Sequence, residues 1–161
     1  TFYFEFGSGY STLLAESFEN ITKIVSIDSS SFWIRDISTK LKTSKTEFIH
    51  IDINAGTVYG YPQDKSKISN WPSYSQAVLE NFDLYFVDGS FRVACCLKGW
   101  ERMGQNSKLL VHDYKREEYH VIEQFFTKVE QGDGLALFEK KELADLKPIQ
   151  DLYEKYKLVT K

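Results

Sequence analysis

The fold is decided near the N-terminus, by the segment Phe2-Tyr3-Phe4-Glu5-Phe6-Gly7-Ser8-Gly9-Tyr10-Ser11-Thr12. Its aromatic residues favour a buried β-strand. Gly7 and Gly9 permit positive φ and let a ligand approach bare backbone, and Ser11 or Thr12 can cap a following helix. Because the first N–H groups of a helix have no partners within it, the segment predicts a nucleotide-binding turn between a strand and a helix.

The turn lacks one glycine of the dinucleotide fingerprint, since Thr12 stands where a third glycine would let a pyrophosphate pack against the helix. The remaining Glu-x-Gly-x-Gly pattern resembles motif I of the class I S-adenosylmethionine-dependent methyltransferases, whose ligand carries no phosphate. The resemblance implies that Gly7, Ser8 and Gly9 contact the cofactor. It also implies that Glu5 helps to hold the ammonium group of the methionine tail, directly or through water.

The length predicts one domain over residues 1–161, and the net charge of −3 excludes a strongly basic surface. We therefore do not expect nucleic acid as a partner. Cys95 and Cys96 are adjacent within an apolar helical run and are expected to be buried hydrophobes. With no apolar run of membrane-spanning length and no signal peptide, we expect no membrane association and a cytoplasmic location.

A second strand, Ile21 to Ile27, ends at Asp28, nineteen residues after Gly9. At this separation an acidic side chain at a strand end can accept hydrogen bonds from both ribose hydroxyls of a nucleotide. Asp28 and the adjacent Ser29 are therefore candidate cofactor ligands. Alternatively, Asp28 only caps the next helix, although Ser30 or Ser31 could take that role.

The next helix carries an apolar stripe, and a third strand from Glu47 to Ile51 ends beside Asp52. The resemblance implies that residues after this strand, Asp52 and Ile53, lie beside the adenine. The alternative is a solvated loop. The stripe of the helix consists of Trp33, Ile34, Ile37 and Leu41.

Residues 54–75 lose all periodicity and predict a long loop, either a lid or a binding segment. Its aromatic side chains could stack on adenine or on a sugar ring, or could fold back on the domain as a cluster. These aromatic residues include Tyr59, Tyr61, Trp71 and Tyr74.

A short helix around Gln76 to Glu80 leads to a fourth strand over residues 82–89, with Asp88 at its end. Asp88 is expected where a substrate meets the cofactor. Arg92 falls in the first turn of the following helix, where a cation is disfavoured by the helix dipole. Arg92 therefore needs a carboxylate such as Asp88, or the ligand, as its partner; otherwise it is an ordinary exposed arginine.

The fifth strand, residues 108–114, ends in His112-Asp113-Tyr114, and here the resemblance extends beyond one motif. Residues 2 to about 140 resemble a group of class I methyltransferase-like proteins and, more distantly, plant glucuronoxylan O-methyltransferases. Ser90 departs from that pattern, which has arginine there. The segments concerned are EFGSGYSTLL at 5–14, DINAGTVYGYP at 52–62, VDGSFRVACCLK at 87–98 and VHDY at 111–114.

His112, Asp113 and Asp88 are the candidate catalytic residues, with Arg92 and Tyr114 as candidate substrate contacts. Methyl transfer to a hydroxyl needs alignment and removal of a proton, for which a histidine at a strand end is suited; the alternative is a structural imidazole. Acids at these two strand ends hold magnesium in catechol-type methyltransferases. That family has asparagine after the second acid where this chain has Tyr114, so we favour a site without metal.

The C-terminal third predicts architecture alone. Residues 119–129 fit an amphipathic helix, Gly132-Asp133-Gly134 predicts a hairpin, and residues 142–161 fit a helix with Pro148 near its first turn. We therefore predict a doubly wound α/β domain with a mostly parallel seven-stranded sheet and an antiparallel C-terminal hairpin, binding S-adenosylmethionine.

The predicted activity is methyl transfer to a hydroxyl of a small molecule or saccharide. The alternatives are a non-catalytic cofactor-binding module of the same fold and an NAD-dependent oxidoreductase. The oligomeric state stays open.

Overall fold

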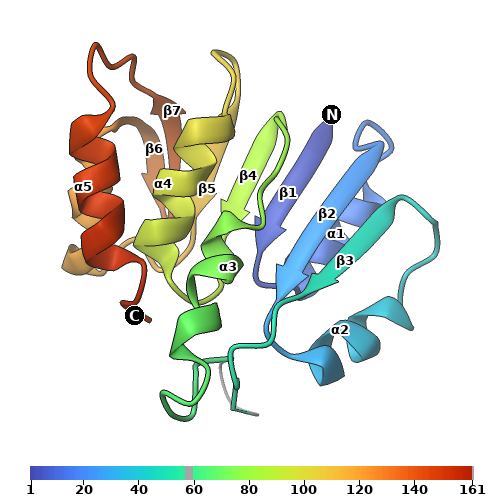
Figure 1. Ribbon diagram of the computed structural model, residues 1–161. Helices are drawn as coiled ribbons and strands as arrows, with labels where there is room; N and C mark the ends of the chain where they lie inside the picture. The colour runs from blue at the N-terminus through green and yellow to red at the C-terminus, as the bar shows by residue number, and fades with distance from the viewer. Residues whose placement is uncertain (57–59, 161) are drawn as a thin grey trace.

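The computed structural model describes residues 1–56 and 60–160, which form a seven-stranded sheet flanked by helices on both faces (Figure 1). The strand order is β3-β2-β1-β4-β5-β7-β6. The strands are β1 (Phe2–Phe6), β2 (Lys23–Asp28), β3 (Thr46–His50), β4 (Leu84–Val87), β5 (Lys108–Val111), β6 (Phe126–Gly132) and β7 (Leu135–Lys140).

The first five strands run parallel, and β7 is antiparallel both to β5 and to β6. The chain reverses between β6 and β7 at Asp133 and Gly134, which both have positive φ. The order reverses at β1, because β2 lies on one side of it and β4 on the other. Open sheets bind ligands at such a switch point. The predicted doubly wound sheet with its C-terminal hairpin is confirmed.

Two helices lie behind the sheet in Figure 1, and the others lie in front of it. Behind are α1 (Tyr10–Ser17) and α2 (Ser31–Ser38), whose side of the sheet has the smaller apolar cluster around Tyr3, Ile24 and Phe86. In front are α3 (Pro72–Gln76), α4 (Arg92–Arg102) and α5 (Lys147–Tyr156), over the main core. Within the described ranges, every helix is too short or too polar to cross a bilayer.

The main core is formed by every second side chain of the parallel strands, because alternate residues face the same side of a sheet. Phe4 and Phe6 of β1 and Tyr85 and Val87 of β4 point to the α4 side and are at most 1% exposed. Cys95 and Cys96 of α4 pack against this side as free, buried thiols, as predicted. This burial fixes the register of β1 against β4, and with it the position of the turns that follow both strands.

Several predicted boundaries were wrong. The helix expected at residues 76–80 lies earlier, at α3, because Pro72 suits a first helical turn. The expected helix over residues 119–129 is a 3-10 segment (Glu117–Gln124) followed by β6, since Phe126 and its neighbours pair with β7. The C-terminal helix is shorter than 142–161 and begins near Pro148; Lys161 lies outside the described residues.

The predicted loop over residues 54–75 contains regular structure in its second half. Ala55 and Pro62 pair as an isolated antiparallel bridge, and Tyr59 lies outside the described residues. A 3-10 turn (Ile68–Asn70) leads into α3, and Trp71 and Tyr74 are buried in the main core. The prediction of a loop was therefore wrong for residues 68–75.

Candidate active site

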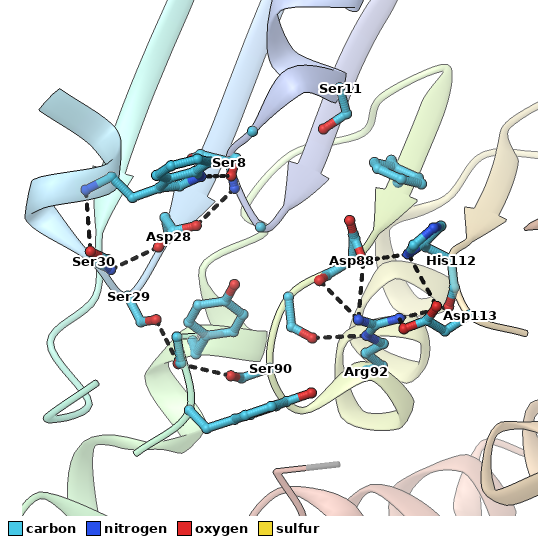
Figure 2. Close-up of a pocket in the computed structure, with 18 of the residues that line it drawn as sticks. Ser8, Ser11, Asp28, Ser29, Ser30, Asp88, Ser90, Arg92, His112 and Asp113 are labelled. Atoms are coloured by element: carbon cyan, nitrogen blue, oxygen red, sulfur yellow. Dashed lines mark hydrogen bonds and ion pairs between the residues drawn. The ribbon is translucent and has the colours of Figure 1, made fainter. Parts of the chain in front are cut away.

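A cavity of about 780 Å³ opens at the carboxyl ends of β1, β2, β4 and β5 (Figure 2). It brings together most of the residues predicted from the sequence, and leaves out four of them. Those that line it are Gly7, Ser8, Gly9, Asp28, Ser29, Asp88, Arg92, His112 and Asp113. Those outside its lining are Glu5, Asp52, Ile53 and Tyr114.

The turn after β1 uses its two glycines differently. Gly7 has φ +100°, and a Cβ there would lie 2.7 Å from the backbone nitrogen of Gly89, in the turn after β4. Gly7 is therefore required both by its conformation and by close backbone contact. Gly9 has φ 179°, an extended value open to any residue, so it does not use the positive φ that glycine permits. Gly9 is the N-cap of α1, a role predicted for Ser11 or Thr12.

Glu5 lies beneath this turn and is completely buried. Its carboxylate accepts hydrogen bonds from four hydroxyls, those of Tyr3 (2.9 Å), Ser11 (2.8 Å), Ser26 (2.7 Å) and Thr12. Burial raises the pKa of Glu5, and the hydroxyl donors oppose that rise. Thr12, which stands where a dinucleotide-binding turn would have its third glycine, thus donates a hydrogen bond to Glu5. Glu5 is buried and lies outside the cavity lining. Its predicted interaction with the ammonium group of the cofactor, directly or through water, stays a prediction.

Asp28 shapes the opposite wall of the cavity. Its carboxylate accepts from the backbone N–H groups of Ser8 (2.9 Å) and Ser30 (2.7 Å), so it ties the turn after β1 to the turn after β2. Burial raises the pKa of Asp28, and these N–H donors oppose the rise. The N-cap of α2 is Ser30, which accepts from the N–H of Trp33 at 3.2 Å. Asp28 is therefore not the N-cap of α2, and it lines the cavity, where its carboxylate oxygens can accept further hydrogen bonds.

The two residues predicted beside an adenine lie elsewhere. Asp52 forms an exposed ion pair with Lys67, and Ile53 is wholly buried. That edge of the cavity is instead formed by Gly60, whose carbonyl accepts from the hydroxyls of Ser29 (2.9 Å) and Ser90 (3.1 Å). Gly60 thus links the residues that follow β2 and β4.

Arg92 is the centre of the charged cluster on the other side of the cavity. It is only 7% exposed and forms ion pairs with Asp88 (3.0 Å) and Asp113 (3.2 Å). It also donates to the carbonyls of His112 (2.7 Å) and Gly89 (3.1 Å). The prediction that Arg92 needs a carboxylate partner is confirmed, and the alternative of an exposed arginine is wrong.

The carboxylate of Asp88, which pairs with Arg92, also holds His112. Its Nδ1 lies 2.8 Å from Oδ1 of Asp88, which leaves Nε2 for a group in the cavity. Asp113 adopts φ 56° and directs its carboxylate back toward Arg92. Tyr114 turns away, is fully buried and donates to Glu123 at 2.9 Å, so it is not placed to contact a substrate.

Asp88, His112 and Asp113 offer three potential metal ligands within 4.8 Å of one another. Arg92 already pairs with both carboxylates, so the negative charge that would attract a divalent ion is largely compensated. The electrostatics therefore favour a hydrogen-bonded acid–base cluster over a metal centre.

The cavity lining also includes residues that were not predicted as site residues, among them Trp33, Ser90 and Arg116. Tyr61 and Tyr74, which were expected either to stack on a ligand or to fold back on the domain, line it as well. Trp33 was assigned to an apolar helix stripe, but its indole N–H donates to the carbonyl of Ser8. The hydroxyls of Tyr119 and Tyr61 beside Arg116 raise the pKa of its guanidinium. Aromatic residues with one polar atom are hard to separate from core residues by periodicity, which explains why Trp33 was missed.

We compared the chain with protein-family models, curated proteins and solved structures. No family model and no curated protein matches the chain. A methyltransferase-like protein from Silicibacter pomeroyi superposes with a TM-score of 0.86 at 25% identity, over 99% of this chain and 88% of its own. The N-methyltransferase NodS from Bradyrhizobium japonicum, in complex with S-adenosylhomocysteine, gives a TM-score of 0.59 at 16% identity over 88% and 79%.

An rRNA methylase from Streptococcus thermophilus gives a TM-score of 0.54 at 15% identity, over 88% of this chain and 87% of its own. The similar structures thus include proteins named for different acceptors, which is why the fold alone does not identify a substrate. The strand order, the C-terminal hairpin and these similarities show that the chain has the class I methyltransferase fold.

Proposed function

We propose that this protein is an S-adenosylmethionine-dependent methyltransferase that transfers a methyl group to a hydroxyl of a small molecule or saccharide. The observation that carries the proposal is that one cavity has Asp28 on one side and the hydrogen-bonded residues Asp88 and His112 on the other. The first suits a ribose and the second suits removal of a proton.

The cofactor side fits a nucleoside without phosphate. Asp28 is an acceptor and suits the ribose hydroxyls, while Gly7 and Gly9 expose backbone to the cavity. Thr12 fills the position where a pyrophosphate would need glycine, and its hydroxyl is committed to Glu5. When bound, the cofactor supplies an electrophilic methyl group carried on a sulfonium. The role of Glu5 in this proposal is to fix the turn from below.

The acceptor side provides a general base. Nε2 of His112 would take the proton of the attacking hydroxyl, and Asp88, bonded to Nδ1, would stabilise the resulting imidazolium. Arg92 holds Asp88 and Asp113 in place and balances their charge. His112 and Asp88 are thus the proposed catalytic residues, and Arg92 is a positioning residue.

A hydroxyl of a small molecule or saccharide is favoured over nucleic acid because the cavity has no uncompensated cluster of cations. Arg92 is paired with two carboxylates, and Arg116 lies 3.7 Å from Asp113. With a net charge of −3, the chain has no strong attraction for a phosphate backbone.

Calorimetric titration with S-adenosylhomocysteine tests the cofactor. We expect micromolar binding, weakened by about 1.5–3 kcal/mol in Asp28→Ala through loss of a charged acceptor. Asp36→Ala is the matched control, since Asp36 lies on the surface of α2 and pairs only with Lys40. Heat with NADH and none with S-adenosylhomocysteine would instead support an oxidoreductase.

Activity against a panel of hydroxyl acceptors tests the base. His112→Ala should lower kcat by roughly 10²–10⁴-fold. His120→Ala should leave kcat unchanged, because His120 bonds the carbonyl of Tyr114 outside the cavity. Binding without any methylated product would support the non-catalytic module.

A further inference from the structure

The hydroxyl of Tyr74, a residue that lines the cavity, has no hydrogen-bond partner among the described residues. Tyr74 belongs to α3, is 1% exposed and lines the cavity. Its ring is held between Phe6 and Phe91, at centroid distances of 6.0 and 5.9 Å.

The other tyrosines with little exposure all have hydroxyl partners. The Tyr85 hydroxyl accepts from the N–H of Phe82 at 3.0 Å, and the Tyr114 hydroxyl donates to Glu123 at 2.9 Å. The hydroxyls of Tyr3, Tyr119 and Tyr153 are likewise bonded to side chains. Tyr74 differs from these tyrosines, and because it lines the cavity its hydroxyl is available to a group bound there.

The hydroxyl lies against the backbone where the turns after β1 and β4 meet. A Cβ on Gly89 would be 2.1 Å from the Tyr74 oxygen, and one on Gly7 would be 2.7 Å from the nitrogen of Gly89. Burial raises the pKa of Tyr74, and Asp28 contributes most among the nearby charges. The hydroxyl therefore stays protonated, is available as a donor, and lies within the field of the carboxylate assigned to the ribose.

The two groups are complementary. Asp28 can only accept a hydrogen bond, whereas Tyr74 can donate one. A ligand hydroxyl both donates and accepts, so a single ribose hydroxyl can satisfy Asp28 with its proton and Tyr74 with its oxygen. An apolar ligand group would leave Tyr74 unpaired.

We propose that Tyr74 is a cofactor-specificity residue whose hydroxyl donates a hydrogen bond to a ribose oxygen of the bound nucleoside. This inference rests on the proposed function and adds a contact to it. The packing of the ring on Phe6 and Phe91 presets the direction of the donor, so binding needs no rearrangement of the side chain.

The test is Tyr74→Phe, with Tyr85→Phe as the matched control. Tyr74→Phe keeps the ring packing and should weaken both S-adenosylhomocysteine and adenosine by about tenfold in calorimetric titration. Its melting temperature should not fall, because no bond within the protein is lost. Tyr85→Phe should bind both ligands as the wild type does and melt lower, because it leaves the N–H of Phe82 unpaired.

The outcomes separate the inference from the proposed function. Unchanged affinity in Tyr74→Phe, with a wild type that binds, overturns the inference and leaves the function standing. A loss with S-adenosylhomocysteine but not with adenosine overturns the assignment to the ribose. A lower melting temperature in Tyr74→Phe shows a structural role and also overturns it. A wild type that binds neither ligand removes the proposed function and the inference together.

Discussion

Replacing Gly7 by alanine tests the contact on which the site is built. Gly7 has φ +100°, a conformation that side-chain-bearing residues rarely adopt. A Cβ at this position would lie 2.7 Å from the nitrogen of Gly89 and 2.9 Å from the carbonyl carbon of Asp88. Both neighbours are backbone atoms, so no side chain can rotate away to relieve the overlap. The turns after β1 and β4 must therefore separate.

The cost follows from strain and from the hydrogen bonds at the two turns. An unfavourable backbone conformation costs about 1–2 kcal/mol. Separation weakens the bonds from Gly7 N to Ile27 O (2.7 Å) and from Asp88 N to Phe6 O (2.9 Å). With about 0.5–1.5 kcal/mol for each bond, we expect a loss of roughly 2–4 kcal/mol in the free energy of unfolding. For a chain of this size that lowers the melting temperature by roughly 5–15 °C.

The assay is urea unfolding followed by circular dichroism, with Gly9→Ala as the control. Gly9 is extended, and the nearest heavy atom to an added Cβ is Nε1 of Trp33 at 3.8 Å. Gly9→Ala meets no backbone atom and loses only a favoured N-cap residue, so it should cost no more than about 1 kcal/mol, clearly less than Gly7→Ala. Equal losses in the two variants, or no loss in Gly7→Ala, would refute the reasoning.

Three further predictions concern single side chains. Burial raises the pKa of Glu5 above its unfolded value, so its contribution to stability is present at acid pH and is lost as pH rises through the raised pKa. Urea unfolding at pH 4 to 8 should accordingly show Glu5→Gln gaining on the wild type as pH rises; a constant difference would contradict it. Arg92→Met should cost about 2–3 kcal/mol in thermal unfolding, below the range for fully buried pairs, because the Asp88 and Asp113 carboxylates are 36% and 38% exposed. A loss near zero would mean that the cluster does not need its cation. Asp52→Asn should leave both S-adenosylhomocysteine affinity and the melting temperature unchanged, since its pair with Lys67 is exposed. A clear loss of affinity would return Asp52 to the binding site.

The sheet and one half of the site could be predicted from the sequence because they depend on local patterns. Strands that end in Asp28 and Asp88 must bring these acids to one edge when the sheet is parallel. The position of Arg92 in a first helical turn identified its need for a carboxylate without any coordinates. Such inferences use one residue and its place in an element, which is what a sequence shows directly.

The remainder depends on contacts between distant segments. From the sequence alone, Tyr74 cannot be distinguished from an aromatic core residue. Only the packing of α3 against the turns after β1 and β4 brings its hydroxyl to the cavity. Four hydroxyls from three elements surround Glu5, and the sequence does not show that these elements meet there. The helix predicted over 119–129 failed because pairing with β7 outweighs the helical periodicity of that segment.

One backbone contact links the two sides of the cavity. The turn that follows β1 carries Ser8, bonded to Asp28, and packs through Gly7 on Gly89. Gly89 directly follows Asp88, the partner of His112 and Arg92. The direct backbone contact between these two turns therefore constrains the separation of Asp28, the proposed acceptor for the ribose, from His112, the proposed base, with only the Asp28 and Asp88 carboxylates completing the link. A fixed separation of this kind is what an in-line transfer between two bound groups requires, because a shift of about 1 Å in either group costs rate steeply. The glycine turn thus matters for alignment across the whole cavity as much as for its own contact with a ligand.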